Sequence, residues 1–145
     1  MLSVYFDNCC YHRPYDDQEQ LKVHLETEAK MHIQKMITDK QIDLVYSFIS
    51  EYENSQNPNT NNSRTIANFF KNAVTYVDIL HKAEIRTEAI EIMKTGIKEM
   101  DALQLASAIA GKADYFLTVD KRLLKYQTDK IQIMNPIEFV STMEV

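Results

Sequence analysis

Residues 101–120 read DALQLASAIAGKADYFLTVD, and this stretch decides the fold class more than any other. Its pattern, together with the residues before it, predicts a helix over 98–110 that Gly111 ends. Residues 114–119 then form a short apolar run, which is typical of a buried strand. Asp101 therefore lies in the first turns of a helix, and Asp120 ends the strand that follows.

The alternation of helix and strand continues on both sides of this stretch. The sequence predicts further strands at residues 2–6, 42–46, 76–80 and 131–134. Helical patterns lie between them, and Asn135-Pro136 starts a closing helix, since proline suits a first helical position. We therefore expect an α/β fold with three layers, α/β/α, built on a mainly parallel sheet of about five strands.

The longest predicted helix covers about residues 17–39. Its apolar positions recur every four residues, at Leu21, Leu25, Ala29, Ile33 and Ile37. We expect these side chains to form the buried face of the helix. Asp16 and Asp17 are expected to cap its start, and the polar residues from 12 to 17 are expected to form a loop.

Length and composition limit the class of protein. The chain has 145 residues, the usual size of one domain, and we expect residues 1–145 to form a single domain. Its net charge of −5 argues against a basic nucleic-acid-binding surface, but not against a nuclease, because bound cations reverse the sign of an acidic pocket. Cys9 and Cys10 are adjacent and have no second cluster with which to bind zinc. With no visible signal peptide or membrane-length apolar segment, a cytoplasmic setting is the default expectation.

Four carboxylates fall at positions that such a fold brings together. Asp7 and Asp120 end predicted strands, Glu53 lies on the helix after the second strand, and Asp101 lies on the helix before the Asp120 strand. Each alone is most simply a turn former, a helix-dipole partner or a solvated surface group. In parallel sheets, however, ligands bind at the carboxyl ends of the strands. A cluster of four acids there repels itself unless a cation lies between them.

Phosphodiester hydrolysis gives such a cluster a use. The reaction needs a nucleophilic water and a stabilised leaving oxygen, and one or two Mg²⁺ or Mn²⁺ ions supply both. These hard ions prefer oxygen ligands, mainly carboxylates and water.

Four motifs resemble those of PIN-domain nucleases and span nearly the whole chain in the right order. Residues 4–8 (VYFDN) are similar to the opening strand that ends in Asp, and residues 47–53 to the second motif, a Ser followed six residues later by Glu. Residues 101–108 (DALQLASA) resemble the third, an Asp opening an Ala-rich helix, and residues 116–120 (FLTVD) the fourth. The third and fourth are the most specific. The second is the weakest, because Glu51 competes with Glu53.

The resemblance implies a ribonuclease that depends on Mg²⁺ or Mn²⁺, with Asp7, Glu53, Asp101 and Asp120 as catalytic and metal-binding residues. Family members include the toxins of bacterial toxin–antitoxin pairs, so RNA is the implied substrate and an antitoxin protein a candidate partner. A homodimer is also a candidate, since Tyr and Met, which are favoured at interfaces, are plentiful. The alternative function is a PIN fold that has lost hydrolysis and serves as an RNA- or protein-binding module.

Two residues beside the acids are candidates for supporting roles. Asn8 is placed to orient Asp7, and Thr118 to fix the backbone of Asp120 or to bond a metal-bound water. We expect Glu51 to point away from Glu53, because residues two apart on a helix lie roughly 200° apart around it.

Three basic residues are candidates for binding RNA phosphates. Lys121 and Arg122 directly follow Asp120, although a basic helix start is also a common solvated feature. Arg13 lies in the polar segment beside the site and would hold a phosphate well. Its alternative is an ion pair with Asp16 or Asp17.

Two other phosphate-handling folds fit the sequence less well. A receiver domain needs an acidic pair beside its first strand and a late lysine, whereas here Asp7 is followed by Asn8 and Lys121 follows its aspartate directly. A haloacid-dehalogenase-like phosphatase needs Asp-x-Asp after the first strand, and Cys9 occupies the second position.

Overall fold

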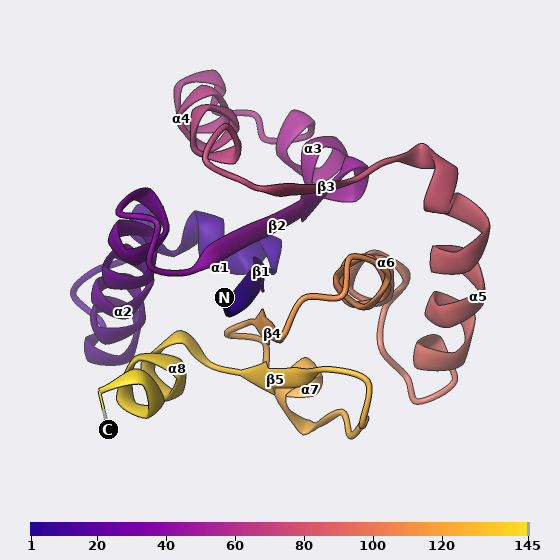
Figure 1. Cartoon of the computed structure of the whole chain (residues 1–145). Coiled ribbons are helices and arrows are strands. Elements are labelled where there is room, and N and C mark those ends of the chain that lie inside the picture. The colour runs from indigo at the N-terminus through magenta and orange to yellow at the C-terminus, as the bar shows by residue number, and fades with distance from the viewer. Residues whose placement is uncertain (145) are drawn as a thin grey trace.

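A five-stranded parallel sheet forms the centre of the computed structural model, which describes residues 1–144 (Figure 1). The strands are β1 (Ser3–Phe6), β2 (Asp43–Ser47), β3 (Thr75–Val77), β4 (Tyr115–Leu117) and β5 (Gln132–Met134). Their order across the sheet is β3-β2-β1-β4-β5, and every neighbouring pair is parallel. The expected fold class is therefore confirmed.

Helices cover both faces of the sheet. They are α1 (Asn8–His12), α2 (Leu21–Thr38), α3 (Phe48–Ser55), α4 (Thr60–Phe70), α5 (Lys82–Met93), α6 (Glu99–Ala110), α7 (Lys121–Lys125) and α8 (Pro136–Met143), with 3-10 turns η1 (Arg13–Tyr15) and η2 (Ile79–His81). Because successive strand residues point to opposite faces, Val4 and Phe6 enter the core under α1, α2, α4 and α8. Tyr5, between them, enters the other core, under α5, α6 and α7.

The strand order places a topological switch point at β1. The chain runs from β1 outward through β2 to β3, and then crosses to β4 and β5 on the other side. Phe6 pairs with Leu117, so β1 and β4 end at the same level, and the backbone N–H of Asp7 donates to the Leu117 carbonyl at 2.9 Å. The carboxyl end of β1, with β2 and β4 beside it, is where such sheets bind ligands.

The segment after β1 is more helical than the sequence suggested. Residues expected to form a polar loop belong in part to the short helix α1 and the turn η1, which the sequence analysis missed. Helix α2 begins only at Leu21, with Gln20 as its N-cap, so the expected capping by Asp16 and Asp17 is wrong. Asp16 instead pairs with Arg13, and Asp17 accepts the Glu19 backbone N–H.

The buried face of α2 also differs from the expected one. Leu21 and Leu25 are exposed, and the buried positions are Val23, Glu26, Thr27, Lys30, Ile33 and Ile37. An α-helix has 3.6 residues per turn, so side chains that recur every four residues shift gradually around the helix axis. The expected stripe therefore joins the core only at its C-terminal end.

Two charged side chains lie on this buried face. Glu26 accepts hydrogen bonds from Arg13 Nε at 3.0 Å and from the Asn135 amide, which tie α2 to η1 and to the start of α8. Lys30 is 5% exposed; its Nζ donates to Gln34 at 2.7 Å and lies within 6 Å of the rings of three aromatic residues, Phe6, Tyr11 and Phe69. Burial lowers the pKa of Lys30 to about 8.

We expect Lys30→Met to be more stable than the wild type at neutral pH, by an amount that shrinks as the pH rises. The unfolded chain holds the Lys30 proton with a pKa near 10.5, above the folded value of about 8. In that interval the unfolded state binds more protons, so wild-type stability rises with pH through this group. Chemical denaturation should show the gap narrowing by about 1–2 kcal/mol from about pH 7.5 to about pH 9.5.

The matched control for this test is Lys22→Met, which removes an exposed lysine of the same helix. Its stability relative to the wild type should stay constant over the same pH range. A stability difference for Lys30→Met that is also constant with pH would contradict a lowered pKa for Lys30.

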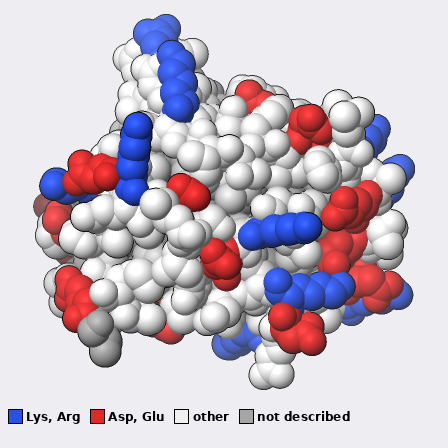
Figure 2. All heavy atoms as spheres, viewed as in Figure 1, with Lys and Arg blue, Asp and Glu red and all other residues white. Residues whose placement is uncertain are grey.

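Charged side chains of both signs share the surface. Figure 2 shows Lys and Arg lying beside Asp and Glu over much of one face, with broad uncharged areas between them. None of the helices in residues 1–144 is long and apolar enough to cross a membrane.

Candidate functional site

Two of the four candidate carboxylates come directly from strand ends. Asp7 follows β1 and is the N-cap of α1, where its Oδ1 accepts the Asn8 backbone N–H at 2.9 Å. Asp120 follows β4 and caps α7, accepting the Arg122 backbone N–H at 2.8 Å. Since β1 and β4 are neighbours, the two residues lie at the same edge of the sheet.

Thr118 joins these two aspartates. Its hydroxyl donates to Asp7 Oδ2 at 2.8 Å and accepts the Asp120 backbone N–H at 3.1 Å. The Cys9 thiol also donates to Asp7 Oδ2, at 3.2 Å. Thr118 thus fixes the Asp120 backbone, and Asn8 contacts Asp7 through its own backbone N–H.

Glu53 reaches the site from α3 and is held from α6. Gln104 Nε2 donates to Glu53 Oε1 at 2.6 Å, while the Tyr5 hydroxyl donates to Gln104 Oε1. The Tyr5 oxygen also bonds the hydroxyls of Ser47 and Ser50, at 2.6 and 2.9 Å. This buried network connects β1, β2, α3 and α6 beneath the Glu53 carboxylate.

The side chain of Glu51 points elsewhere, as the helix spacing predicts. Its Oε1 accepts from the hydroxyl of Tyr76 on β3, the edge strand of the sheet. Ser47 caps α3 in a reciprocal arrangement with Ser50, in which each hydroxyl accepts the other residue's backbone N–H. This cap fixes the helix that carries both glutamates.

The pKa values of three of the four acids are raised, and Asp101 has a part in each case. Burial raises the pKa of Asp7 well above its usual range, with a smaller contribution from the charge of Asp101. Burial likewise raises the pKa of Glu53, again with a contribution from Asp101. The pKa of Asp101 itself is raised by burial and then by Asp120, while Lys98 and Arg122 oppose the rise. Each of the other three carboxylates therefore interacts with Asp101.

The types of donor in this cluster fit a hard divalent cation. In residues 1–144, none of the four carboxylates forms an ion pair, so their mutual repulsion is not neutralised by a salt bridge. The same residues contain no group of three or more His, Cys, Asp or Glu side chains already spaced to hold a metal. An ion would therefore have to draw the carboxylates closer than they lie here.

The three basic candidates lie in different settings. Arg13 is bound to Asp16 at 2.8 Å and to Glu26 at 3.0 Å, so the ion-pair alternative is the one the structure shows, with Glu26 as an unexpected second partner. Lys121 and Arg122 are exposed at the start of α7, and the charge of Arg122 lowers the pKa of Asp101.

The sequence analysis missed Gln104 and Tyr5 as parts of the site. Gln104 lies three residues after Asp101, hence on the same side of α6, and it is a buried polar residue among mainly apolar ones. Tyr5 lies in the central strand, where a buried hydroxyl needs a partner. The sequence shows the spacing of Gln104 from Asp101 and the place of Tyr5 in a strand, but not the contacts that both side chains make.

Comparisons with solved structures show the same fold. VapBC2 from Rickettsia felis bound to a DNA fragment from its promoter matches with a TM-score of 0.60 and 14% identity, over 92% of this chain and 98% of the other. FitAcB from Neisseria gonorrhoeae matches with a TM-score of 0.52 and 14% identity, over 92% and 97%. A search of curated protein sequences found no match.

The family comparison is more specific. The profile of the PIN domain matches residues 17–128, which is most of the chain and includes Glu53, Asp101 and Asp120. The resemblance in the sequence motifs, the five-stranded parallel sheet and this match agree. The chain belongs to the PIN domain family.

Proposed function

We propose that this protein is a metal-dependent endoribonuclease that hydrolyses phosphodiester bonds of RNA. The observation that carries the proposal is the position of Asp7 and Asp120 at the neighbouring ends of β1 and β4, with a contribution of the Asp101 charge to the raised pKa values of Asp7 and Glu53. Membership of the PIN domain family supports it. Within residues 1–144 these acids form no ion pair, and such acids at this position are costly unless they serve a cation and a substrate.

Each side chain has a distinct part in this proposal. Asp7, Glu53, Asp101 and Asp120 are the ligands for Mg²⁺ or Mn²⁺, which when bound supplies an activated water and stabilises the leaving oxygen. Thr118 orients Asp7, and Gln104 orients Glu53. Lys121 and Arg122 hold phosphates of the RNA beside the acids. Arg13 already pairs with two carboxylates, so it is a weaker candidate for phosphate binding than Lys121 and Arg122.

A catalytically inactive binding module is the second candidate function. The absence of three acids at metal-binding spacing in residues 1–144 favours it, because an active centre must bring its ligands together. The presence of all four carboxylates favours the nuclease, since a binding module has no need to keep them near one another.

The decisive experiment is a cleavage assay on mixed RNA substrates with Mg²⁺, with Mn²⁺ and with EDTA. We expect cleavage with either ion and none with EDTA. A variant lacking all four carboxylates is the control for contaminating nucleases. Cleavage by that variant at the wild-type rate, or no cleavage with either ion, would leave the binding module as the better account.

We further propose that an antitoxin protein binds this chain. We also propose that residues 1–145 form one PIN domain and that the protein acts in the cytoplasm. The support is the toxin resemblance and the structural similarity to VapBC2 and FitAcB. Coexpression with a small protein encoded next to this one should yield a stable complex that blocks RNA cleavage. A neighbouring protein that neither binds nor inhibits would contradict the pairing.

We propose that the protein also forms a homodimer. Exposed apolar side chains at the edge of the sheet and after it, Val74, Tyr76, Ile79 and Leu80, support self-association. Sedimentation at micromolar concentration should find a species of twice the 16.9 kDa chain mass. The monomer alone would contradict the dimer.

A further inference from the structure

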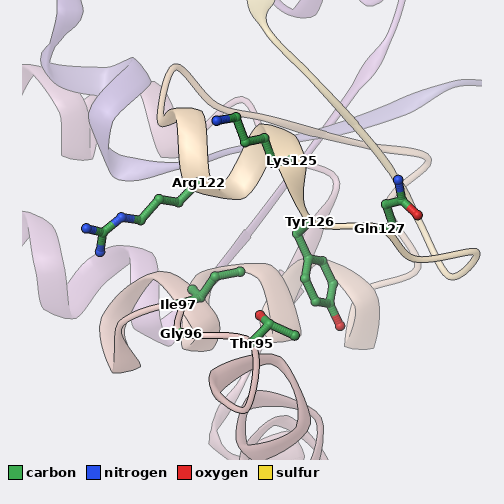
Figure 3. Close-up of a pocket in the computed structure, with 7 residues that line it drawn as sticks. All are labelled: Thr95, Gly96, Ile97, Arg122, Lys125, Tyr126 and Gln127. Carbon is green, nitrogen blue, oxygen red and sulfur yellow. The ribbon is translucent and has the colours of Figure 1, made fainter.

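A cavity of about 500 Å³ lies beside α7. One wall is the segment that joins α5 to α6, residues 95–97, and the other is α7 with the two residues after it (Figure 3). Arg122 and Lys125 project from α7, and the ring of Tyr126 extends from its end towards Thr95. The volume lies within the range of roughly 300–1,000 Å³ that small-molecule sites occupy.

The cavity is next to the candidate active site. Helix α7 begins at Lys121, immediately after Asp120, and Asp120 caps it. Arg122 lines the cavity, and its charge also opposes the rise in the pKa of Asp101 that burial and Asp120 cause. Arg122 is therefore close to the acids and to the cavity at the same time.

The lining combines free positive charge with an aromatic ring. Within residues 1–144, Arg122 and Lys125 take part in no ion pair, although the protein as a whole carries a net charge of −5. The Tyr126 ring is half-buried, packs at its base against the core under α6, and its hydroxyl has no hydrogen-bond partner in the described part of the chain. Cations for the backbone and an aromatic face for the base are the features with which proteins bind single-stranded nucleic acid.

We propose that this cavity is a nucleotide subsite for single-stranded RNA, in which Tyr126 stacks on a base next to the cleaved bond while Arg122 and Lys125 contact the flanking phosphates. The inference rests on the proposed function, since it names the substrate class of that site. Stacking tolerates any base, so the subsite selects unpaired RNA rather than a sequence. Duplex RNA keeps its bases stacked on one another and cannot offer one to Tyr126.

The subsite can be altered without removing the support of α7. Leu123 is fully buried and anchors the helix, whereas Arg122 and Lys125 are exposed. Tyr126→Leu keeps an apolar group at the base of the cavity but removes the ring, and Tyr126→Phe keeps the ring. The pair therefore separates stacking from packing.

Binding is measured by fluorescence anisotropy with a labelled ten-nucleotide RNA of mixed sequence, in Mg²⁺ and in an Asp101→Asn background to prevent cleavage. Tyr126→Leu should weaken binding by about 5- to 100-fold, and Tyr126→Phe by less than about twofold. Lys125→Gln should weaken binding and reduce the salt slope by about 0.7. The charge control is Arg64→Gln, at an exposed arginine on α4, across the molecule from α7, which should bind as its parent does (Figure 1).

Three results would overturn the subsite: no RNA binding by the parent at low salt, equal binding by Tyr126→Leu and its parent, or displacement of the RNA by polyglutamate as readily as by unlabelled RNA. The last would mean an acidic peptide site. These results are separable from failure of the nuclease. If RNA binding depends on Tyr126 but the wild-type protein cleaves no RNA, only the proposed nuclease activity is contradicted. If Tyr126→Leu binds and cleaves RNA as its parent does, only the proposed subsite is contradicted.

Discussion

Asp101→Asn is expected to lower metal-dependent RNA cleavage by at least about 100-fold, the loss that follows when a metal centre gives up a few kcal/mol of transition-state stabilisation. The charge of Asp101 contributes to the raised pKa values of Asp7 and Glu53, and Asp120 contributes to the raised pKa of Asp101. Asparagine keeps the shape of the side chain but is a poor ligand for a hard cation. A cleavage time course with Mg²⁺ and with Mn²⁺ measures the loss.

The same substitution should leave the metal-free protein as stable as before, or more stable. The pKa of Asp101 is raised in the folded state, so its ionised form costs stability increasingly as the pH rises from the unfolded value through the folded one. Asparagine avoids that cost. Asp7→Asn should show the same loss of cleavage and should also leave the metal-free protein as stable as before or more stable, because burial raises the pKa of Asp7 well above its usual range.

Thermal melts with EDTA and with Mg²⁺ complete the test. A ligand stabilises the folded state only in proportion to its occupancy, so added Mg²⁺ should raise the melting temperature less in Asp101→Asn than in the wild type. Asp129→Asn, at an exposed aspartate in the loop before β5, is the matched control and should match the wild type in both assays. Equal metal-induced shifts in all three proteins would exclude Asp101 as a ligand.

Gln104→Met is expected to lower cleavage by about 10- to 100-fold, as the loss of residues that orient metal ligands typically does. Methionine has nearly the volume of glutamine, so the packing of α6 is kept, but Glu53 loses the hydrogen bond that fixes its carboxylate. The Tyr5 hydroxyl still has Ser47 and Ser50, so we expect a stability loss of only about 1 kcal/mol. Cleavage kinetics and chemical denaturation of the same sample separate the two effects.

Gln34→Met provides the comparison for this variant. It removes another glutamine side-chain hydrogen bond, the one to Lys30 on α2, in the opposite core. Its cleavage rate should equal that of the wild type. If Gln104→Met also cleaves at the wild-type rate, Gln104 has no role in positioning Glu53.

Sequence reasoning succeeded where a pattern is local. The helix and strand around Asp101 and Asp120 and the closing helix after Asn135 were predicted, because each follows from residues within a few positions of one another. The placement of Asp7 and Asp120 at the same edge of the sheet followed from the parallel sheet that alternating helices and strands predict.

Long-range pairing is what the sequence could not show. Lys30 and Glu26 break the apolar pattern of α2, and the reason lies far away, in Arg13 and in Asn135, which is 109 residues from Glu26. The partnership of Gln104 with Glu53 spans 51 residues. Such polar contacts follow from the packed fold, and no repeat or spacing in the sequence predicts them.

The Tyr5 hydroxyl determines which of its hydrogen-bond partners donate and which accept. It has one hydrogen, which it gives to Gln104, so the hydroxyls of Ser47 and Ser50 must both point their hydrogens at Tyr5. Their oxygens in turn accept backbone N–H groups. The bonds thus run one way, from the two serines through Tyr5 and Gln104 to Glu53, and such chains polarise their members cooperatively. The carboxylate of Glu53 is therefore the last acceptor in this chain of hydrogen bonds, and the chain orients it before any substrate binds.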